Sequence, residues 1–302
     1  MRAVVVGGSG QIGGHLLDAL AERGHEGVGT FQTVPTPGLV PLDAAELDAS
    51  AAWLRGLRPD VVFYPAGFTW VDGCERDPAR SRSANRDQPI NLARAAASVG
   101  ARFVLFSTDY VFDGQAGPYD EASPTNPLSE YGRSKLGAEL DLAALGPEHL
   151  TLRTSWVFGP ERQGKNFAYQ LVKALRDGRS VECPSDQASS PSYGPDIALA
   201  AVALAESGAS GLVHLAGPEV TARPDFARAI ARAFRLDPSL ISSRPTAEIA
   251  QGAPRPLACG LTSHRLVDLL PAELHPRPLA PALDDFLERL DDFVGWADPR
   301  AI

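Results

Sequence analysis

The sequence lacks the features that mark secreted, zinc-binding and nucleic-acid-binding proteins. Its 302 residues include only three cysteines, which lie far apart at Cys74, Cys183 and Cys259, so neither a disulfide framework nor a zinc site is expected. Lys and Arg number 28 against 37 Asp and Glu, which gives a formal net charge of −9. This acidic balance argues against non-specific binding to nucleic acid, although a few local arginines would still suit a small anionic substrate.

Long apolar runs are missing as well. No stretch approaches the roughly 18 apolar residues of a membrane span. The run Ala3–Val6 is short and meets glycine at once, unlike a signal peptide. The six histidines show no metal-ligand spacing. We therefore expect a cytoplasmic protein with no metal, no membrane and no nucleic acid as partner.

Short apolar runs alternate with helical patterns along most of the chain, which predicts an α/β fold with a doubly wound parallel sheet of the Rossmann type. Their nearly complete lack of polar residues indicates strands that are buried on both faces. The expected strands are Ala3–Val6, Gly27–Phe31, Asp60–Tyr64, Arg102–Phe106, Thr151–Val157 and Gly211–Leu215. The expected helices include Pro89–Ser98, Phe167–Arg176, Ile197–Ala205 and a terminal amphipathic helix over Asp284–Asp292.

The last third of the chain is rich in proline, which indicates a smaller, loop-rich lobe. We expect a dinucleotide-binding domain at residues 1–160, completed by about residues 195–216. Residues 161–194 and 217–302 would form a smaller C-terminal lobe that binds the substrate. These boundaries make the lobe interleave with the last strands of the sheet.

A glycine-rich segment follows the first strand and opens a helix. Gly8-Ser9-Gly10-Gln11-Ile12-Gly13 is weak as a pattern, but this position strengthens it. Glycines allow a sharp turn close to a pyrophosphate, and the helix N-terminus offers free N–H groups. We expect cofactor contacts from Gly7, Gly10, Gln11, Ile12 and Gly13.

The end of the second strand bears on the choice of cofactor. An acidic residue there would hold the ribose of NAD, but the segment after Gly27 carries no acid before Leu42. Thr30 and Gln32 would instead donate hydrogen bonds, which favours NADPH, with NADH as the alternative. Asp43 is either a contact to the adenine end or an ordinary helix cap.

Tyr131 and Lys135 lie four residues apart, about one helical turn, and so share one face of a helix. An ammonium near a phenol favours the phenolate, so we expect Lys135 to lower the pKa of Tyr131 from its reference of about 10. A tyrosine tuned in this way can exchange a proton with a carbonyl or alcohol oxygen near neutral pH.

Four motifs together resemble the dTDP-4-dehydrorhamnose reductase family of extended short-chain dehydrogenase/reductases. They are Gly-Gly-Ser-Gly-Gln-Ile-Gly, Ser-Thr-Asp-Tyr-Val-Phe-Asp-Gly, Tyr-Gly-Arg-Ser-Lys and Arg-Thr-Ser-Trp-Val-Phe-Gly, and the resemblance covers about residues 1–205. It implies hydride transfer from a reduced nicotinamide to C4 of a dTDP-4-keto-6-deoxyhexose. By position, Tyr131 would be the proton donor, Lys135 its electrostatic tuner and a ligand of the nicotinamide ribose, and Thr108 a hydroxyl that polarises the carbonyl.

The resemblance implies further contacts, each with a plainer alternative. Trp156 would line the sugar pocket or simply pack in the core, and Tyr110 is open to the same two interpretations. Lys165, Asn166 and Arg153 would supply donors to a diphosphate or serve only as surface or packing residues. The matching segments also carry further candidate contacts to the cofactor (Ala66, Gly67 and Thr69) and to the substrate (Val71).

Two other functions fit the same scaffold. A sugar-nucleotide 4-epimerase uses the same Thr, Tyr and Lys but keeps its NAD through the cycle. A regulatory subunit similar to the methionine adenosyltransferase beta subunit binds the nucleotide without turnover. A 4,6-dehydratase is disfavoured, because Tyr110 stands where its second carboxylate would follow Asp109. A nucleotide sugar is the expected partner, and a homodimer is left open.

Overall fold

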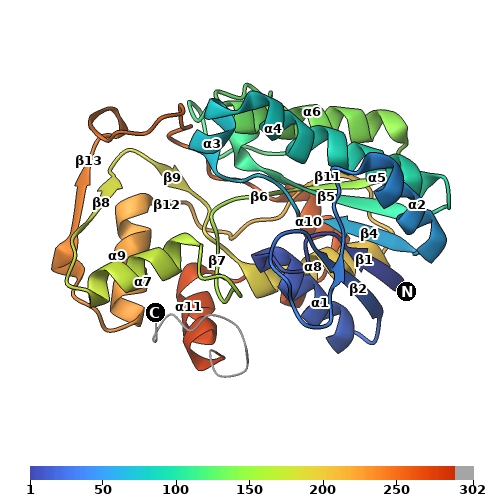
Figure 1. Ribbon diagram of the computed structural model, residues 1–302. Coiled ribbons are helices and arrows are strands. Elements are labelled where there is room, and N and C mark those ends of the chain that lie inside the picture. Colours follow the sequence, from blue (N-terminus) through green and yellow to red (C-terminus); the bar gives the residue numbers. More distant parts are fainter. Residues whose placement is uncertain (290–302) are drawn as a thin grey trace.

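The computed structural model describes residues 1–289 and is built around a seven-stranded sheet (Figure 1). All paired neighbours in this sheet run parallel. The predicted doubly wound parallel sheet is therefore confirmed. Across the sheet the strands are β11 (Gly211–His214), β6 (Leu150–Thr154), β5 (Arg102–Thr108), β4 (Val61–Tyr64), β1 (Arg2–Val5), β2 (Glu26–Phe31) and β3 (Val40–Pro41).

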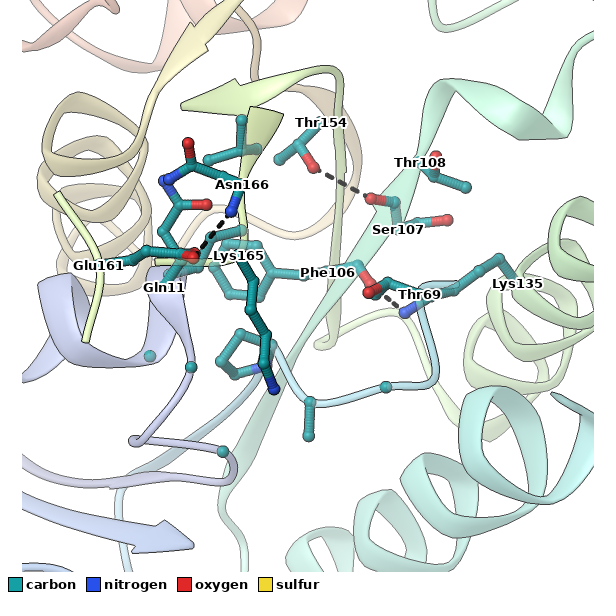
Figure 2. A pocket seen from close by; sticks show the side chains of 18 of the residues that line it. Gln11, Thr69, Phe106, Ser107, Thr108, Lys135, Thr154, Glu161, Lys165 and Asn166 are labelled. Atoms are coloured by element: carbon teal, nitrogen blue, oxygen red, sulfur yellow. Dashed lines mark hydrogen bonds between the residues drawn. The ribbon is translucent and has the colours of Figure 1, made fainter. Parts of the chain in front are cut away.

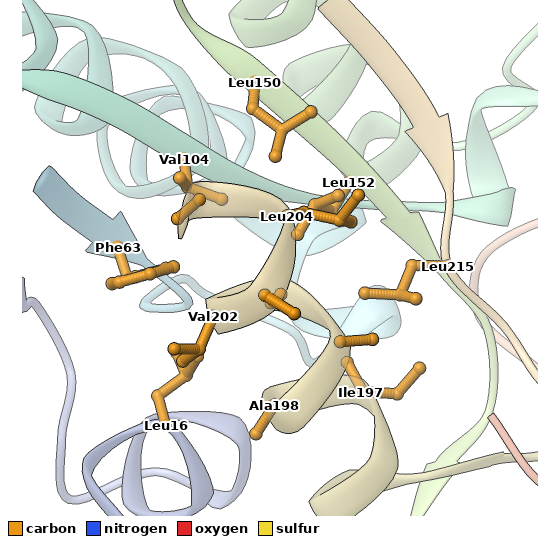
Figure 3. Close-up of a cluster of buried hydrophobic side chains, with 14 of the residues drawn as sticks. Leu16, Phe63, Val104, Leu150, Leu152, Ile197, Ala198, Val202, Leu204 and Leu215 are labelled. Carbon is orange, nitrogen blue, oxygen red and sulfur yellow. The ribbon is translucent and has the colours of Figure 1, made fainter. Parts of the chain in front are cut away.

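Helices cover both faces of the sheet. Successive residues of each strand point to opposite sides, so apolar strands present an apolar surface on each face. Val5 and Phe63 face α1 (Gln11–Glu22) and α8 (Gly194–Glu206), as Figure 3 shows for Phe63 beside Leu16 and Val202. Val4 and Tyr64 face the other way. The helices over that second face are α2 (Leu47–Leu57), α5 (Gln88–Ala97) and α6 (Glu130–Leu145).

A smaller lobe lies beside the sheet (Figure 1). An apolar cluster separate from those on the two faces of the sheet forms its core. Its centre is aromatic, with the ring centroids of Phe158 and Phe226 5.4 Å apart and those of Phe234 and Phe286 5.5 Å apart. Its main elements are α7 (Phe167–Arg176), β8 (Val181–Pro184), α9 (Arg223–Ala233), β13 (Ile241–Arg244) and α11 (Leu279–Glu288). The boundaries predicted for the two domains stay a prediction.

The remaining short elements include two pairs of strands and three α-helices, of which α3 (Val71–Arg76) and α4 (Pro78–Arg82) contact α6, and α10 (His264–Leu269) contacts β11. The strand pairs are β7 (Val157–Phe158) with β10 (Ser192–Tyr193) and β9 (Ala188–Ser189) with β12 (Thr221–Ala222). Within residues 1–289, no helix has the length and apolar character needed to cross a bilayer.

Two predicted elements differ from the structure. The strand expected over Thr151–Val157 is interrupted, because β6 ends at Thr154 and Trp156 has a left-handed backbone with φ of +39°. The terminal helix begins earlier than expected, at Leu279, and ends at Glu288. The last residues predicted for it, 290–292, lie outside the described part of the chain.

The parallel arrangement brings several loops to one edge of the sheet. The carboxyl ends of β1, β4, β5 and β6 all point the same way, and Thr108 at the end of β5 is in register with Thr154 at the end of β6. Ligands of open α/β sheets bind at this edge. The candidate site lies there.

Candidate active site

A cavity of about 620 Å³ lies between the carboxyl edge of the sheet and the lobe. Most of the residues predicted from sequence line it, although they come from widely separated segments. These are Gly7, Gly10, Gln11, Ile12, Gly13, Gln32, Ala66, Gly67, Thr69, Val71, Thr108, Tyr110, Tyr131, Lys135, Trp156, Lys165 and Asn166. Thr30 and Asp43 are not among the lining residues.

The glycine turn is too tight for side chains at two of its positions. Gly7 has φ of +92°, and the Gly10 amide donates to the Gly7 carbonyl at 3.0 Å. A Cβ on Gly13 would lie 2.1 Å from the Gly7 oxygen, which is backbone and has no rotamer that relieves the clash. Thr30 supports this turn from behind: it is 1% exposed, and its hydroxyl accepts from the Gly7 amide at 3.2 Å. The predicted role of Thr30 as a donor at the cavity is therefore not what the structure shows.

Gln32 and Asp43 contact each other at the far end of the cavity. The Gln32 amide donates to Asp43 Oδ1 at 2.6 Å, and the same oxygen accepts from the Ala45 amide at 2.9 Å. Asp43 closes a local turn, since α2 begins only at Leu47. Gln32 lines the cavity, whereas Asp43 does not.

Tyr131 and Thr108 meet at the centre of the cavity. Tyr131 lies in the first turn of α6, where the Ser129 hydroxyl caps the helix by accepting from the Gly132 amide at 3.2 Å. Tyr131 is 8% exposed and Thr108 6%. The ring of Tyr110 packs edge-on against that of Tyr131, with centroids 5.6 Å apart.

The pKa of Tyr131 is shifted in the direction opposite to the prediction. Burial raises it well above 10, and a hydrogen bond from Thr108 opposes burial without overcoming it. Lys135 does not compensate, because its ammonium donates to the Phe106 carbonyl at 2.9 Å (Figure 2). The predicted lowering is therefore wrong for this structure. Desolvation of the phenol, which sequence spacing does not reveal, has the larger effect.

Burial also shifts the pKa of Lys135, which is 4% exposed. Loss of water lowers its pKa to about 8, while the Glu139 carboxylate one turn further along α6 opposes this shift. Lys135 is therefore still largely a cation at neutral pH. A Cβ added to Gly67 would lie 3.4 Å from its nitrogen, so the ammonium rests against that stretch of the cavity wall.

A buried ion pair between Arg153 and Glu139 joins β6 to α6. Arg153 donates to Glu139 Oε2 at 2.6 Å, and the Ser107 hydroxyl donates to Oε1. Arg153 also lies 3.3 Å from the ring of His214. This pairing occupies Arg153, which is not part of the cavity lining, so it does not act as the diphosphate donor that the sequence suggested.

Asp109 is a lining residue that the sequence analysis did not assign to the site. It is 2% exposed, and burial raises the pKa of its carboxyl. Its Oδ2 accepts from Ser155 and Ser189, both at 2.7 Å, and its Oδ1 accepts from Thr108 at 3.1 Å. Asp109 thus ties the Thr108 hydroxyl to β9. In the sequence, the only indication that Asp109 belongs to the site is its position directly after Thr108.

On the lobe side, Asn166 is a structural cap. Its Oδ1 accepts from the Ala168 amide at 3.0 Å and its Nδ2 donates to the Gly159 carbonyl at 2.8 Å, so it caps α7. Its backbone amide donates to Glu161 Oε1 at 2.7 Å. Lys165 instead extends its side chain into the cavity (Figure 2). Of these two predicted contacts, Lys165 is the one with a side chain available to a ligand.

Pro65 and Gln163 also line the cavity, although the sequence assigned no role to either. Pro65 directly follows the last residue of β4, where the missing N–H of proline costs no ladder hydrogen bond. The Gln163 amide reaches the backbone oxygen of Ser9 at 3.2 Å and so joins the lobe to the glycine turn.

Comparison with known proteins agrees with this geometry. The model of the family described as RmlD substrate binding domain matches residues 1–291. The dTDP-4-dehydrorhamnose reductase of Mycobacterium tuberculosis is 35% identical, over 93% of this chain and 92% of that protein. The enzyme of the same name from Burkholderia thailandensis is 34% identical, over 91% and 94%.

Solved structures show the same fold. A dTDP-4-dehydrorhamnose reductase from Clostridium acetobutylicum superposes with a TM-score of 0.86 at 28% identity, covering 96% of this chain and 100% of that one. The reductase from Bacillus anthracis, solved in complex with NADP, gives 0.86 at 24% identity, over 95% and 99%. The family model and the curated relatives span nearly the whole chain, and the chain accordingly belongs to the dTDP-4-dehydrorhamnose reductase family.

Proposed function

We propose that this protein reduces the 4-keto group of a dTDP-linked 6-deoxyhexose with NADPH. The observation that carries the proposal is the meeting of two hydroxyl donors, Tyr131 and Thr108, with the buried cation Lys135 in one cavity beside a glycine turn. Membership of the reductase family supports the substrate class. The lobe that closes the cavity would hold the sugar nucleotide.

The residues present suit a dinucleotide. Gly7 and Gly13 let the turn pack closely against Ala66 and against itself, and this brings the start of α1, with its free backbone amides, to the cavity, where they can bind a pyrophosphate. Gln32, directly after β2, is neutral, but the Asp43 carboxylate lies 2.6 Å from its amide nitrogen, so the charge at this end of the cavity does not by itself select NADPH. When bound, NADPH supplies the hydride that turns the carbonyl carbon into a carbinol carbon.

The three central side chains handle the charge that develops on the carbonyl oxygen. Tyr131 gives its phenolic proton to this oxygen, and its raised pKa keeps the proton in place until then. Thr108 donates a second hydrogen bond to the same oxygen, for which its single hydroxyl proton turns from Asp109 Oδ1, the acceptor it has in this structure. Lys135 lies one helical turn away and donates to the Phe106 carbonyl in this structure, so its proposed stabilisation of the remaining phenolate requires the ammonium to turn toward the Tyr131 oxygen during the reaction. Asp109, held by Ser155 and Ser189, keeps the Thr108 hydroxyl at the cavity by accepting its proton until a ketone oxygen replaces Asp109 as the acceptor.

Steady-state oxidation of added NADPH tests the proposal. With a panel of dTDP-4-keto-6-deoxy sugars, we expect one equivalent of NADPH to be consumed per ketone reduced, and a lower kcat/KM when NADH replaces it. Oxidation without any sugar serves as the blank. No turnover with any member of the panel, together with tight NADPH binding, would favour the regulatory-subunit alternative. At least tenfold tighter binding of NADH would overturn the choice of cofactor.

A further inference from the structure

Arg223 is the first residue of α9, and the backbone fixes it beside the cavity. Its amide donates to the Gln187 carbonyl at 2.8 Å, directly after β12 pairs with β9. Within β9, the Ser189 hydroxyl donates to Asp109 Oδ2 at 2.7 Å. The start of α9 is therefore anchored to the carboxylate that holds Thr108.

The guanidinium of Arg223 is stacked on a wall of the cavity. Its Cζ lies 3.4 Å from the ring centroid of Trp156 and 4.7 Å from that of Phe167. Trp156 lines the cavity and has the left-handed backbone noted above, with φ of +39°. A bulky residue keeps such a conformation only where its surroundings enforce it, which is common at binding sites. A guanidinium stacked by its face keeps its edge N–H groups free to donate.

The charge of Arg223 is offset only in part by the protein, through the more distant carboxylate of Asp109. No ion pair joins it to a carboxylate within residues 1–289, whereas Arg153 pairs with Glu139 and Arg255 with Asp72 near the same cavity. Burial lowers its pKa to about 10, which still leaves it protonated at neutral pH. A cation at the N-terminus of a helix also meets the unfavourable end of the helix dipole. Both costs are relieved if an anion binds there.

We propose that Arg223 binds the diphosphate of the sugar-nucleotide substrate, an inference that rests on the proposed function. A guanidinium matches phosphate oxygens with two parallel hydrogen bonds. The pyrophosphate of the cofactor belongs at the opposite end of the cavity, at the glycine turn. The substrate's diphosphate therefore requires its own cation. Arg223 is not itself a lining residue, but it stacks on the lining Trp156 and, unlike Arg153, has no carboxylate within ion-pair distance among the described residues. Lys165, which lines the cavity, is the second cation.

Calorimetric titration of the NADP⁺-saturated protein with dTDP and with thymidine tests this assignment. Charge-assisted hydrogen bonds of this kind correspond to about a 10- to 100-fold change in affinity. We expect Arg223→Gln to weaken dTDP binding by that factor and to leave the affinities for thymidine and NADP⁺ within about twofold. Arg223→Lys, which keeps the charge and loses the planar fork, should fall between.

Arg228→Gln is the matched control, because Arg228 lies on the same helix but pairs with Asp225 at 3.1 Å on the surface. It should bind dTDP like the wild type. If Arg223→Gln binds dTDP with wild-type affinity, the assignment is overturned while the reductase proposal stays intact. If Arg223→Gln does not fold, wild-type affinity in Arg223→Lys has the same consequence. A wild-type protein that binds NADP⁺ but not dTDP would overturn both.

Discussion

Replacing Tyr131 with Phe should lower kcat by roughly 10²- to 10⁴-fold, the range for losing a general acid. The phenolic hydroxyl is the only part removed, and the buried ring stays in place against Tyr110. The dissociation constant for NADPH should therefore remain within about twofold of the wild-type value. Single-turnover reduction of the keto sugar, alongside fluorescence titration with NADPH, measures the two quantities separately.

Tyr119→Phe is the control for this variant. It also removes a buried phenol oxygen, the one that donates to Asp113 at 2.6 Å, but Tyr119 does not line the cavity. Its kcat should stay near the wild-type value even if its melting temperature falls. A Tyr131→Phe enzyme within threefold of wild-type kcat would remove Tyr131 from the proton-transfer step.

Lys135→Ala should impair both cofactor binding and turnover, because one side chain is proposed for two tasks. The buried ammonium would hold the nicotinamide ribose and stabilise the Tyr131 phenolate, so we expect losses of about tenfold or more in each of NADPH affinity and kcat. Lys135→Met, which better preserves the buried volume, should behave alike. Thermal unfolding of both variants separates lost chemistry from lost packing.

The pKa of Lys135 predicts that NADPH affinity depends on pH. This pKa of about 8 means that Lys135 is a cation below that pH and neutral above it. Affinity for NADPH in the free enzyme should therefore fall as the pH rises through about 8. Tyr131 cannot cause this change, since its pKa lies above that range. A wild-type pH profile that stays flat to pH 9.5, or one that Lys135→Met shares, would contradict the role of the charge.

Local signals explain what the sequence predicted well. The bounds of the helix Phe167–Arg176 agree with the structure, because its apolar residues recur on one face and Asn166 caps its first turn. The strand Asp60–Tyr64 was recognised because burial on both faces leaves hardly any polar residue in it. The glycine turn was found for a similar reason, since the close contact that requires Gly13 is with the oxygen of Gly7, only six residues away.

Tertiary contacts explain what the sequence missed. The sign of the Tyr131 pKa shift depends on burial by the whole cavity, which spacing along one helix does not encode. Asp109 gains its role through Ser189, which is 80 residues away, and Arg223 through a stack on Trp156. Thr30 was assigned to the cofactor, but it lies behind the turn that it supports.

Transfer of deuterium tests the central claim most directly. NADPH carrying two deuteriums at C4 of its nicotinamide is mixed with excess protein and a dTDP-4-keto-6-deoxy sugar, and the product is analysed by mass spectrometry and NMR. The account predicts one deuterium at C4 of the sugar for each NADP⁺ formed. A product without deuterium at that carbon, or an epimerised sugar formed while the NADPH remains unconsumed, would contradict it.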